Sequence, residues 1–283
     1  MRHISKTNSS GITLVEVIVA MTVMALLSGI FFNFMASFYQ DTVVSIARNT
    51  QESDTIGALR SIESELTSSI SFAATYDPGP PLGSGTNATD GTAWSHCGNS
   101  SCSTSDYRVL MGRTYTTDKP KSDPTRKIVL RNTIPCSSND MAASRYAENT
   151  VIYFVTRDPN NSTINNLYRR TVVNTIAPTA SLCSTPIQKT TCQPSRIGTT
   201  LPGGGTCQTT DALLLRNIKS FSIDYYNSSN DTAPYTTGQI YATGAAAAGR
   251  VTTAQSIQIN VESAQSIRGT TPSKASLRFS LTP

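Results

Sequence analysis

The residues best suited to chemistry in this 283-residue chain are its six cysteines: Cys97, Cys102, Cys136, Cys183, Cys192 and Cys207. An even number of cysteines in a loop-rich region is typical of up to three disulfides formed in an oxidising compartment. Fifteen pairings are possible, and the close pairs Cys97/Cys102 and Cys183/Cys192 close the shortest loops at the lowest entropic cost. Zinc would need two tight Cys/His clusters, so the spacing favours disulfides and predicts no metal site.

Catalytic residues are hard to assemble from the rest of the chain. Of the two histidines, His3 lies in the polar N-terminal stretch, so His96 is the one candidate base, beside Cys97. A Ser/His/Asp or Cys/His site needs partners that nothing else here indicates. The glycines at 203–205 are not followed by the Lys-Ser/Thr of a phosphate loop. We therefore expect no catalytic residues and no enzyme.

One carboxylate stands in an unusual place. Residues 12–38 read ITLVEVIVAMTVMALLSGIFFNFMASF, an apolar run whose only charge is Glu16. As a helix this run spans roughly 40 Å, more than the ~30 Å hydrocarbon core of a bilayer. Arg2 and Lys6 precede the run, which places the N-terminus in the cytoplasm and sends the rest across. A buried carboxylate costs about 2.5–3.5 kcal/mol on insertion scales, so Glu16 calls for an explanation.

Three simpler interpretations compete for this segment. A secretory signal peptide would end at a small-x-small site, for which Met35–Ser37 is a poor match. A plain signal anchor accounts for everything except Glu16. Glu16 as a chance residue close to the membrane interface is the third.

The stretch from Ser10 to Met21 (SGITLVEVIVAM) resembles the processing site of type IV prepilins and type II secretion pseudopilins. That family has a short basic leader, a Gly before the cut, an apolar helix and a Glu five residues past the Gly. The resemblance implies prepilin peptidase cleavage after Gly11, N-methylation of the new N-terminus Ile12, and an assembly role for Glu16. Many members have Phe where this chain has Ile12.

Simple electrostatics agrees with this resemblance. Cutting before the apolar run leaves the helix attached and creates a charged amine beside lipid. The amine and the Glu16 carboxylate are each costly alone and tolerable together. Pairing between neighbouring subunits would also set their axial register, as a buried polar group does in a helical bundle.

The sequence predicts one long helix followed by a series of strands, which together must position these residues. A helix is expected from about Thr13 to Phe72, with a stripe of apolar residues at three- and four-residue steps in its second half: Val43, Ile46, Ala47, Thr50, Leu59, Ile62, Leu66 and Ile70. Strands are expected over 107–112, 127–132, 150–157, 167–173, 212–226, 256–262 and 274–281. The 150–157 and 167–173 strands flank a turn-rich segment and predict a hairpin. Gly/Pro-rich excursions at 76–105 and 174–211 carry most of the cysteines.

The predicted fold class is α+β and pilin-like: a long N-terminal helix, membrane-spanning in its first half and amphipathic in its second, packed on an antiparallel β-sheet domain with long disulfide-bearing loops. We divide the chain into a leader (1–11), the helix (12–72) and an extracytoplasmic head (73–283). The strand runs resemble J-type minor pseudopilins and W-type minor pilins. Some pseudopilins bind calcium near the positions of Asp224, Asn230 and Asp231, but without bunched carboxylates we expect no cofactor.

The resemblance implies a structural minor pilin or pseudopilin, a single-pass inner-membrane protein that enters a filament. Its partners would be other pilins, the prepilin peptidase and the assembly platform. The alternative is a surface-anchored adhesin or DNA- or sugar-binding protein that uses the helix only as a tether. The net charge of +5 is scattered over doublets such as Arg169/Arg170, Lys119/Lys121 and Arg126/Lys127, which are more often solvated faces than a nucleic-acid track.

Overall fold

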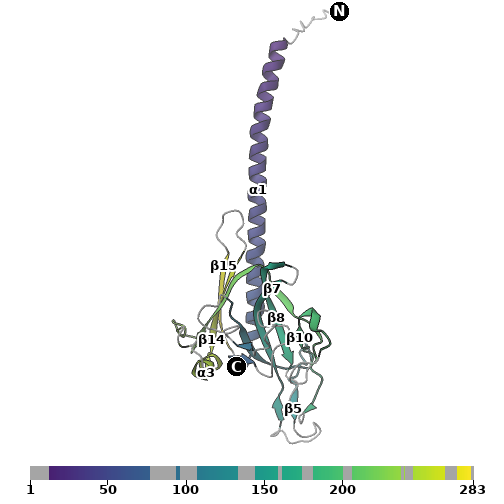
Figure 1. Cartoon of the computed structure of the whole chain (residues 1–283), viewed down its shortest axis with the longest axis vertical. Helices are drawn as coiled ribbons and strands as arrows, with labels where there is room; N and C mark the ends of the chain where they lie inside the picture. The colour runs from purple at the N-terminus through teal and green to yellow at the C-terminus, as the bar shows by residue number, and fades with distance from the viewer. Residues whose placement is uncertain are drawn as a thin grey trace, which may run out of the picture. The chain divides into compact units, whose positions relative to one another are not determined.

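The computed structural model describes residues 13–76, 94–95, 107–132, 144–158, 161–173, 181–199, 206–236, 239, 245–264 and 273–281. Its longest element is helix α1, Leu14–Leu66, drawn in purple and blue in Figure 1. The 53 residues of α1 correspond to a length of about 80 Å. The chain forms two compact units, Met1–Thr50 and Gln51–Pro283, and α1 contributes residues to both.

In the first unit, α1 is apolar and exposed. Leu, Met, Ala and Phe dominate its N-terminal part, and large side chains such as Leu26, Ile30 and Phe32 are each more than 60% exposed. The helix satisfies its own backbone hydrogen bonds, which is the requirement for a chain segment in lipid. The helix is long and apolar enough to cross a membrane, with a mean hydropathy of 2.3 in its most apolar window.

In the second unit, the last turns of α1 are amphipathic. Thr55, Ala58, Leu59, Ile62 and Leu66 are buried at three- and four-residue steps, as the apolar stripe predicts for this part of the helix. Farther toward the N-terminus, in the first unit, the same stripe is exposed: Val43 by 50% and Ile46 by 60%.

Helix α1 ends at Leu66, six residues before the expected boundary. The Thr67 amide donates to the Glu63 carbonyl and the Ser69 amide to the Leu66 carbonyl, which closes the last turn. Residues Ser71–Phe72 then form strand β1 and pair with β4 (Leu110–Tyr115). The polar Thr67–Ser69 triplet favours the turn because its side chains compete for backbone hydrogen bonds.

A five-stranded antiparallel sheet forms the centre of the second unit, in the order β1-β4-β7-β8-β12. Its remaining strands are β7 (Glu148–Asp158), β8 (Asn161–Val173) and β12 (Ala212–Leu215). The expected hairpin is confirmed as β7–β8, which lie side by side in Figure 1. Seven consecutive residues of β7 are buried. On one face of the sheet they belong to the core cluster that includes the end of α1, and on the other face they pack with side chains of β4 and β8 in a second apolar cluster.

A three-stranded antiparallel sheet follows, in the order β13-β14-β15: Ile218–Tyr226, Ser256–Ser263 and Lys274–Ser280. The single strand expected over 212–226 is wrong, because the chain leaves the first sheet after Leu215 and enters the second at Ile218. Asn217 has φ of 57° at this point, a left-handed conformation that Asn tolerates and that breaks the extended run. Helix α3 (Ala245–Thr253) was not expected.

Short strands complete the described residues: β2 (Thr75–Tyr76), β3 (Trp94–Ser95), β5 (Leu130–Asn132), β6 (Ser144–Tyr146), β9 (Ser181–Leu182), β10 (Thr191–Cys192) and β11 (Thr209–Thr210). A 3-10 turn, η2 (Pro194–Arg196), follows β10. Strands β5 and β9 pair with each other, and β10 pairs in parallel with β11.

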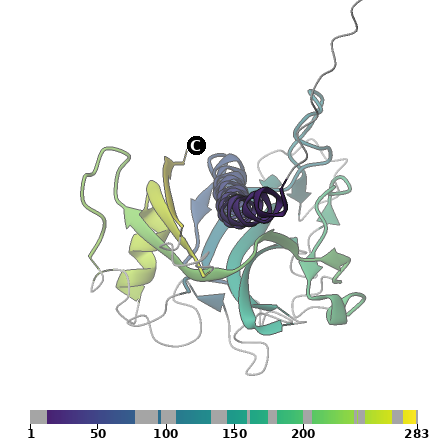
Figure 2. The ribbon, with the colours of Figure 1, turned by 90° about the horizontal axis from the view of Figure 1, so that it is seen from above.

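One hydrophobic core joins both sheets to the end of α1. Ile62 and Leu66 of the helix belong to the same cluster as Leu110 and Tyr153 of the first sheet and Phe279 of the second. Figure 2 shows the strands of the two sheets and α3 from above. At Gly112 of β4, an added Cβ would collide with the Leu66 side chain, so the absence of a side chain there lets the helix end approach the strand.

Candidate functional site

The first turn of α1 contains the carboxylate that the sequence singles out. The Thr13 amide and hydroxyl both donate to Glu16 Oε2, at 2.9 and 3.0 Å, and the Glu16 amide donates to Thr13 Oγ1 at 3.3 Å. This reciprocal pair is a capping box, in which Thr13 satisfies an amide of the first turn and Glu16 satisfies the amide of the cap. The sequence signal, Thr-x-x-Glu before an apolar run, was not used in predicting the helix start.

The geometry leaves part of the carboxylate available. Both bonds from Thr13 go to Oε2, and no described residue donates to Oε1. Glu16 also lies at the positive end of the helix dipole, which favours a negative charge there. A second donor, such as an amine, can therefore reach Glu16 without breaking the cap.

The leader residues lie outside this geometry. The expected cleavage and methylation residues Gly11 and Ile12 fall outside the described residues, which begin at Thr13. Cys97, Cys102, Cys136 and His96 also fall outside them, as do the glycines at 203–205.

A disulfide joins Cys192 to Cys207, with 6.1 Å between the Cα atoms. The expected Cys183/Cys192 pair is therefore wrong. Cys183 is disulfide-bonded too, but not to Cys192. Loop length misled the prediction because strand pairing brings the two cysteines together across a longer loop. Cys192 lies in β10, Cys207 lies two residues before β11, and the two strands pair in parallel.

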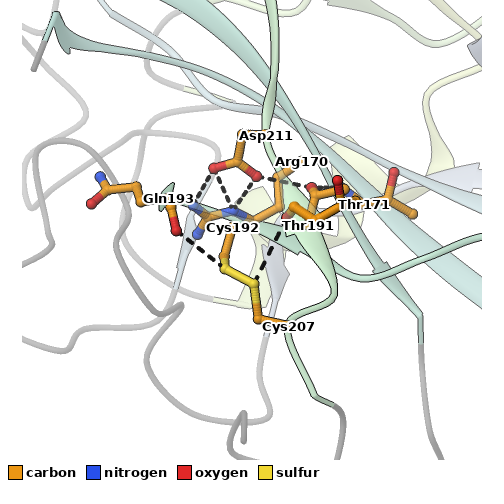
Figure 3. Close-up of polar contacts among 8 residues, drawn as sticks. Arg170, Thr171, Thr191, Cys192, Gln193, Cys207 and Asp211 are labelled. Atoms are coloured by element: carbon orange, nitrogen blue, oxygen red, sulfur yellow. Dashed lines mark hydrogen bonds and ion pairs between the residues drawn. A yellow bond between two sulfur atoms is a disulfide. The ribbon is translucent and has the colours of Figure 1, made fainter. Parts of the chain in front are cut away.

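Beside this disulfide lies a buried ion pair (Figure 3). Arg170 and Asp211 side chains are 2% and 5% exposed, and Arg170 Nε lies 3.0 and 3.2 Å from the two Asp211 oxygens. Thr191 donates to Asp211 Oδ1 at 2.8 Å and accepts the Thr171 amide at 2.9 Å. The Arg170 guanidinium also lies 5.2 Å from the centre of the Phe154 ring. The pair thus fastens the disulfide-bearing segment to β8.

The neighbouring residue Arg169 points to the opposite face of β8, toward α1. Arg169 Nε donates to Glu65 Oε2 at 2.6 Å, a second guanidinium nitrogen pairs with Oε1, and the Tyr153 hydroxyl donates to Oε2. Burial disfavours the phenolate of Tyr153, and the adjacent Glu65 charge adds to the effect, so the pKa of Tyr153 is raised well above its ordinary value. Burial opposes the charge of Arg169, but its bonds to Glu65 prevail and raise the Arg169 pKa.

The expectation of a solvated face is therefore wrong for Arg169 and Arg170. Each is paired with a carboxylate and built into the fold. The partners Glu65 and Asp211 are remote in sequence, and no local pattern reveals them.

Asp224 and Asp231, considered above as calcium ligands, make hydrogen bonds within the fold. Asp231 accepts the Ser228 amide and hydroxyl, which lowers the pKa of Asp231, and Asp224 accepts the Asn260 amide group. Arg278 donates to the carbonyls of Ser229 and Asp231 and stacks on the Tyr226 ring at 3.6 Å. Within the described residues, no group of three or more His, Cys, Asp or Glu side chains is placed to hold a metal.

Comparison with known proteins identifies the N-terminal segment. The prokaryotic N-terminal methylation motif matches residues 6–32, which include the expected cleavage site, Thr13 and Glu16. This motif marks the chain as a prepilin of the type IV pilin and pseudopilin type. The α+β fold, with α1 packed on antiparallel sheet, is consistent with that class. No curated protein and no solved structure matches the chain.

Proposed function

We propose that this prepilin is a structural minor pilin or pseudopilin, cleaved after Gly11 and built into a type IV pilus or a type II secretion pseudopilus. The observation that carries the proposal is Glu16, the only charge between residues 12 and 40, whose Oε2 is held by Thr13 while no described residue bonds to its Oε1. An exposed apolar helix needs lipid or other helices around it, and a carboxylate at its start needs a cation.

The proposed sequence of events follows from these needs. Cleavage would create the Ile12 α-amine next to the capping residue Thr13, close to Glu16 of the same chain. In a bundle of such helices, the unengaged Oε1 can accept the amine of a neighbouring subunit. Helix packing then replaces lipid around side chains such as Phe31 and Phe32, while the Gln51–Pro283 unit faces outward on the extracytoplasmic side.

The finer assignment rests on the head. Its strand runs resemble J-type pseudopilins and W-type minor pilins, and the chain is long for a major pilin. We further propose that the subunit has no catalytic activity and no resident cofactor. Its partners would be other pilins, the prepilin peptidase and the assembly platform of the inner membrane.

Intact-mass and N-terminal peptide analysis tests the processing step. The protein is extracted from membranes of cells with and without prepilin peptidase. We expect peptidase-dependent loss of residues 1–11 and a methyl group on Ile12. An intact leader in both strains would favour the tether interpretation, and cleavage near Ser37 would indicate a secreted protein; either result overturns the proposal.

A second experiment tests the role of Glu16. Glu16→Val should leave membrane insertion intact and remove the subunit from sheared filaments, because the neighbour's amine loses its acceptor. Thr22→Val is the matched control, since it places the same residue in the same helix without removing a charge. Equal recovery of both variants in filaments would show that the carboxylate has no assembly role.

A further inference from the structure

The second unit contains a polar groove that the assembly role does not use. It lies between the last turns of α1, the α1-facing side of β4, β7 and β8, and the segment 117–128. Its volume is about 500 Å³. This size falls in the range of sites that hold small ligands.

Asn149 of β7 lines this groove and has an unused donor. The side chain is 1% exposed, and the Thr116 hydroxyl donates to its Oδ1 at 2.8 Å. Its Nδ2 has no hydrogen-bond partner among the residues that the structure describes. Since buried polar groups are nearly always paired, a buried donor left unpaired in a groove indicates that an acceptor belongs there.

Positive charge surrounds the same groove. The lining includes four cations, Lys119, Lys121, Arg126 and Arg169, and one carboxylate, Glu65. Glu65 is already paired with Arg169, Lys121 donates to Ser64 at 3.2 Å, and Lys119 lies 3.7 Å from Asp123. No described residue bonds to the exposed Arg126 guanidinium, which leaves a planar donor suited to a carboxylate.

The remaining polar lining consists largely of hydroxyl groups. They come from Ser61 and Ser64 of α1, from Ser68 in the turn after the helix, and from threonines of the sheet and its following segment, Thr114, Thr117 and Thr171. Ser61 and Ser64 are three residues apart and so share one face of the helix. Hydroxyls both donate and accept, which matches a ligand that carries many hydroxyls of its own.

We propose that this groove binds a carboxylated sugar, with Arg126 on the carboxylate and Asn149 Nδ2 donating to a ring or hydroxyl oxygen. The unpaired donor, the excess of cations and the hydroxyl lining together fit an anionic polyol. An acidic peptide fits less well, since the groove offers few apolar side chains to anchor one. The site is independent of the assembly role of Glu16, so either proposal can fail alone.

Calorimetric titration of the full-length chain in an uncharged detergent tests the proposal. The probes are trigalacturonate, its neutral counterpart galactotriose, and hexaglutamate. We expect trigalacturonate to bind one to one and galactotriose at least tenfold more weakly. Arg126→Gln should weaken trigalacturonate binding tenfold or more, because it removes the cation that pairs with the carboxylate. Arg126 is exposed, so its replacement leaves the fold intact.

Two further variants sharpen the result. Asn149→Ala should also weaken binding several-fold in protein whose circular dichroism matches the wild type. Arg113→Gln, an exposed arginine of β4 outside the groove, should change the affinity less than twofold. No binding of trigalacturonate, equal binding by Arg126→Gln, or hexaglutamate binding as tightly as trigalacturonate would each overturn the assignment.

Discussion

The two faces of β8 hold consecutive arginines in opposite surroundings. Arg169 faces α1 and the polar groove, and its side chain and that of Glu65 are 26% and 25% exposed. Arg170 faces the disulfide-bearing segment, and its pair with Asp211 is almost completely buried. Both pairs join distant segments, but water reaches only one of them.

This difference decides what each pair contributes. A pair that is about one quarter exposed, such as Arg169–Glu65, is partly screened by solvent and contributes modestly to stability. A buried pair has lost its hydration, so removing one partner leaves a charge with nothing to compensate it. The disulfide face is therefore the one where single changes should unfold the head, and the α1 face is the one that tolerates adjustment and can admit a ligand.

The largest effect should come from Asp211→Ala. It leaves the Arg170 charge buried without its carboxylate, and we expect a loss of about 3–5 kcal/mol in the free energy of unfolding. Equilibrium denaturation of the full-length chain in detergent measures it. The control Asp54→Ala removes an exposed helix carboxylate and should change stability by less than about 0.5 kcal/mol. Equal losses in the two variants would mean that the buried Arg170–Asp211 pair does not stabilise the head.

The double variant Cys192→Ser/Cys207→Ser should follow. The sequence separation of 15 residues corresponds to about 3 kcal/mol of unfolded-state loop entropy. The same denaturation assay applies, with Gln208→Ala as a control at the exposed position directly after Cys207. A loss well below 1 kcal/mol would show that strand pairing and Asp211 already hold the loop without the bond.

On the α1 face, Glu65→Gln should have a smaller effect than Asp211→Ala. The amide oxygen can still accept a hydrogen bond from Arg169 or Tyr153, and solvent can reach the donors that lose their partner. We therefore expect a loss of about 1–2 kcal/mol in the free energy of unfolding. Glu63→Gln, on the same turn but with no ion pair in the described structure, is the matched control. A larger loss than that of Asp211→Ala would reverse the comparison of the two faces.

The smallest effect is a pH dependence at the alkaline end. The raised pKa of Tyr153 means that the folded chain keeps the phenol proton while the unfolded chain loses it near pH 10. The stabilisation is complete below pH 10 and is lost as the pH rises further, because the unfolded state then binds fewer protons. Tyr153→Phe should flatten the fall in stability between pH 9 and pH 11. An unchanged slope would place the titration elsewhere.

Periodicity predicted the elements whose environment is uniform. The sequence correctly predicts the buried stripe from Leu59 to Leu66, the β7–β8 hairpin and the alternation of β14. In each case the local pattern of apolar and polar residues matches the environment of the element. The only charge of the apolar run, Glu16, is identified from the sequence because a carboxylate is costly in lipid. The motif at residues 6–32 agrees with the class inferred from it.

The misses share a physical cause, which is that a partner remote in sequence decides the outcome. The pairing of Cys192 with Cys207 depends on β10 and β11, and the burial of Arg170 depends on Asp211, 41 residues away. The break at Asn217 arises because the first part of the run 212–226 pairs in the five-stranded sheet as β12, and the second part pairs in the three-stranded sheet as β13. Helix α3 did have a local signal in its four consecutive alanines, residues 245–248.

The sharing of one core between α1 and the C-terminal strands has a consequence for biogenesis. Gln51 of α1 donates a hydrogen bond to Ser263, and Ile62 shares its cluster with Phe279. In the proposed orientation, the helix leaves the translocation channel before the strands, and β15 leaves it after the other described elements. The head then cannot close until almost the whole polypeptide has been exported, so a truncated product remains open, with its apolar helix face available to chaperones and proteases. The core of the head is therefore complete only after β15 has been exported.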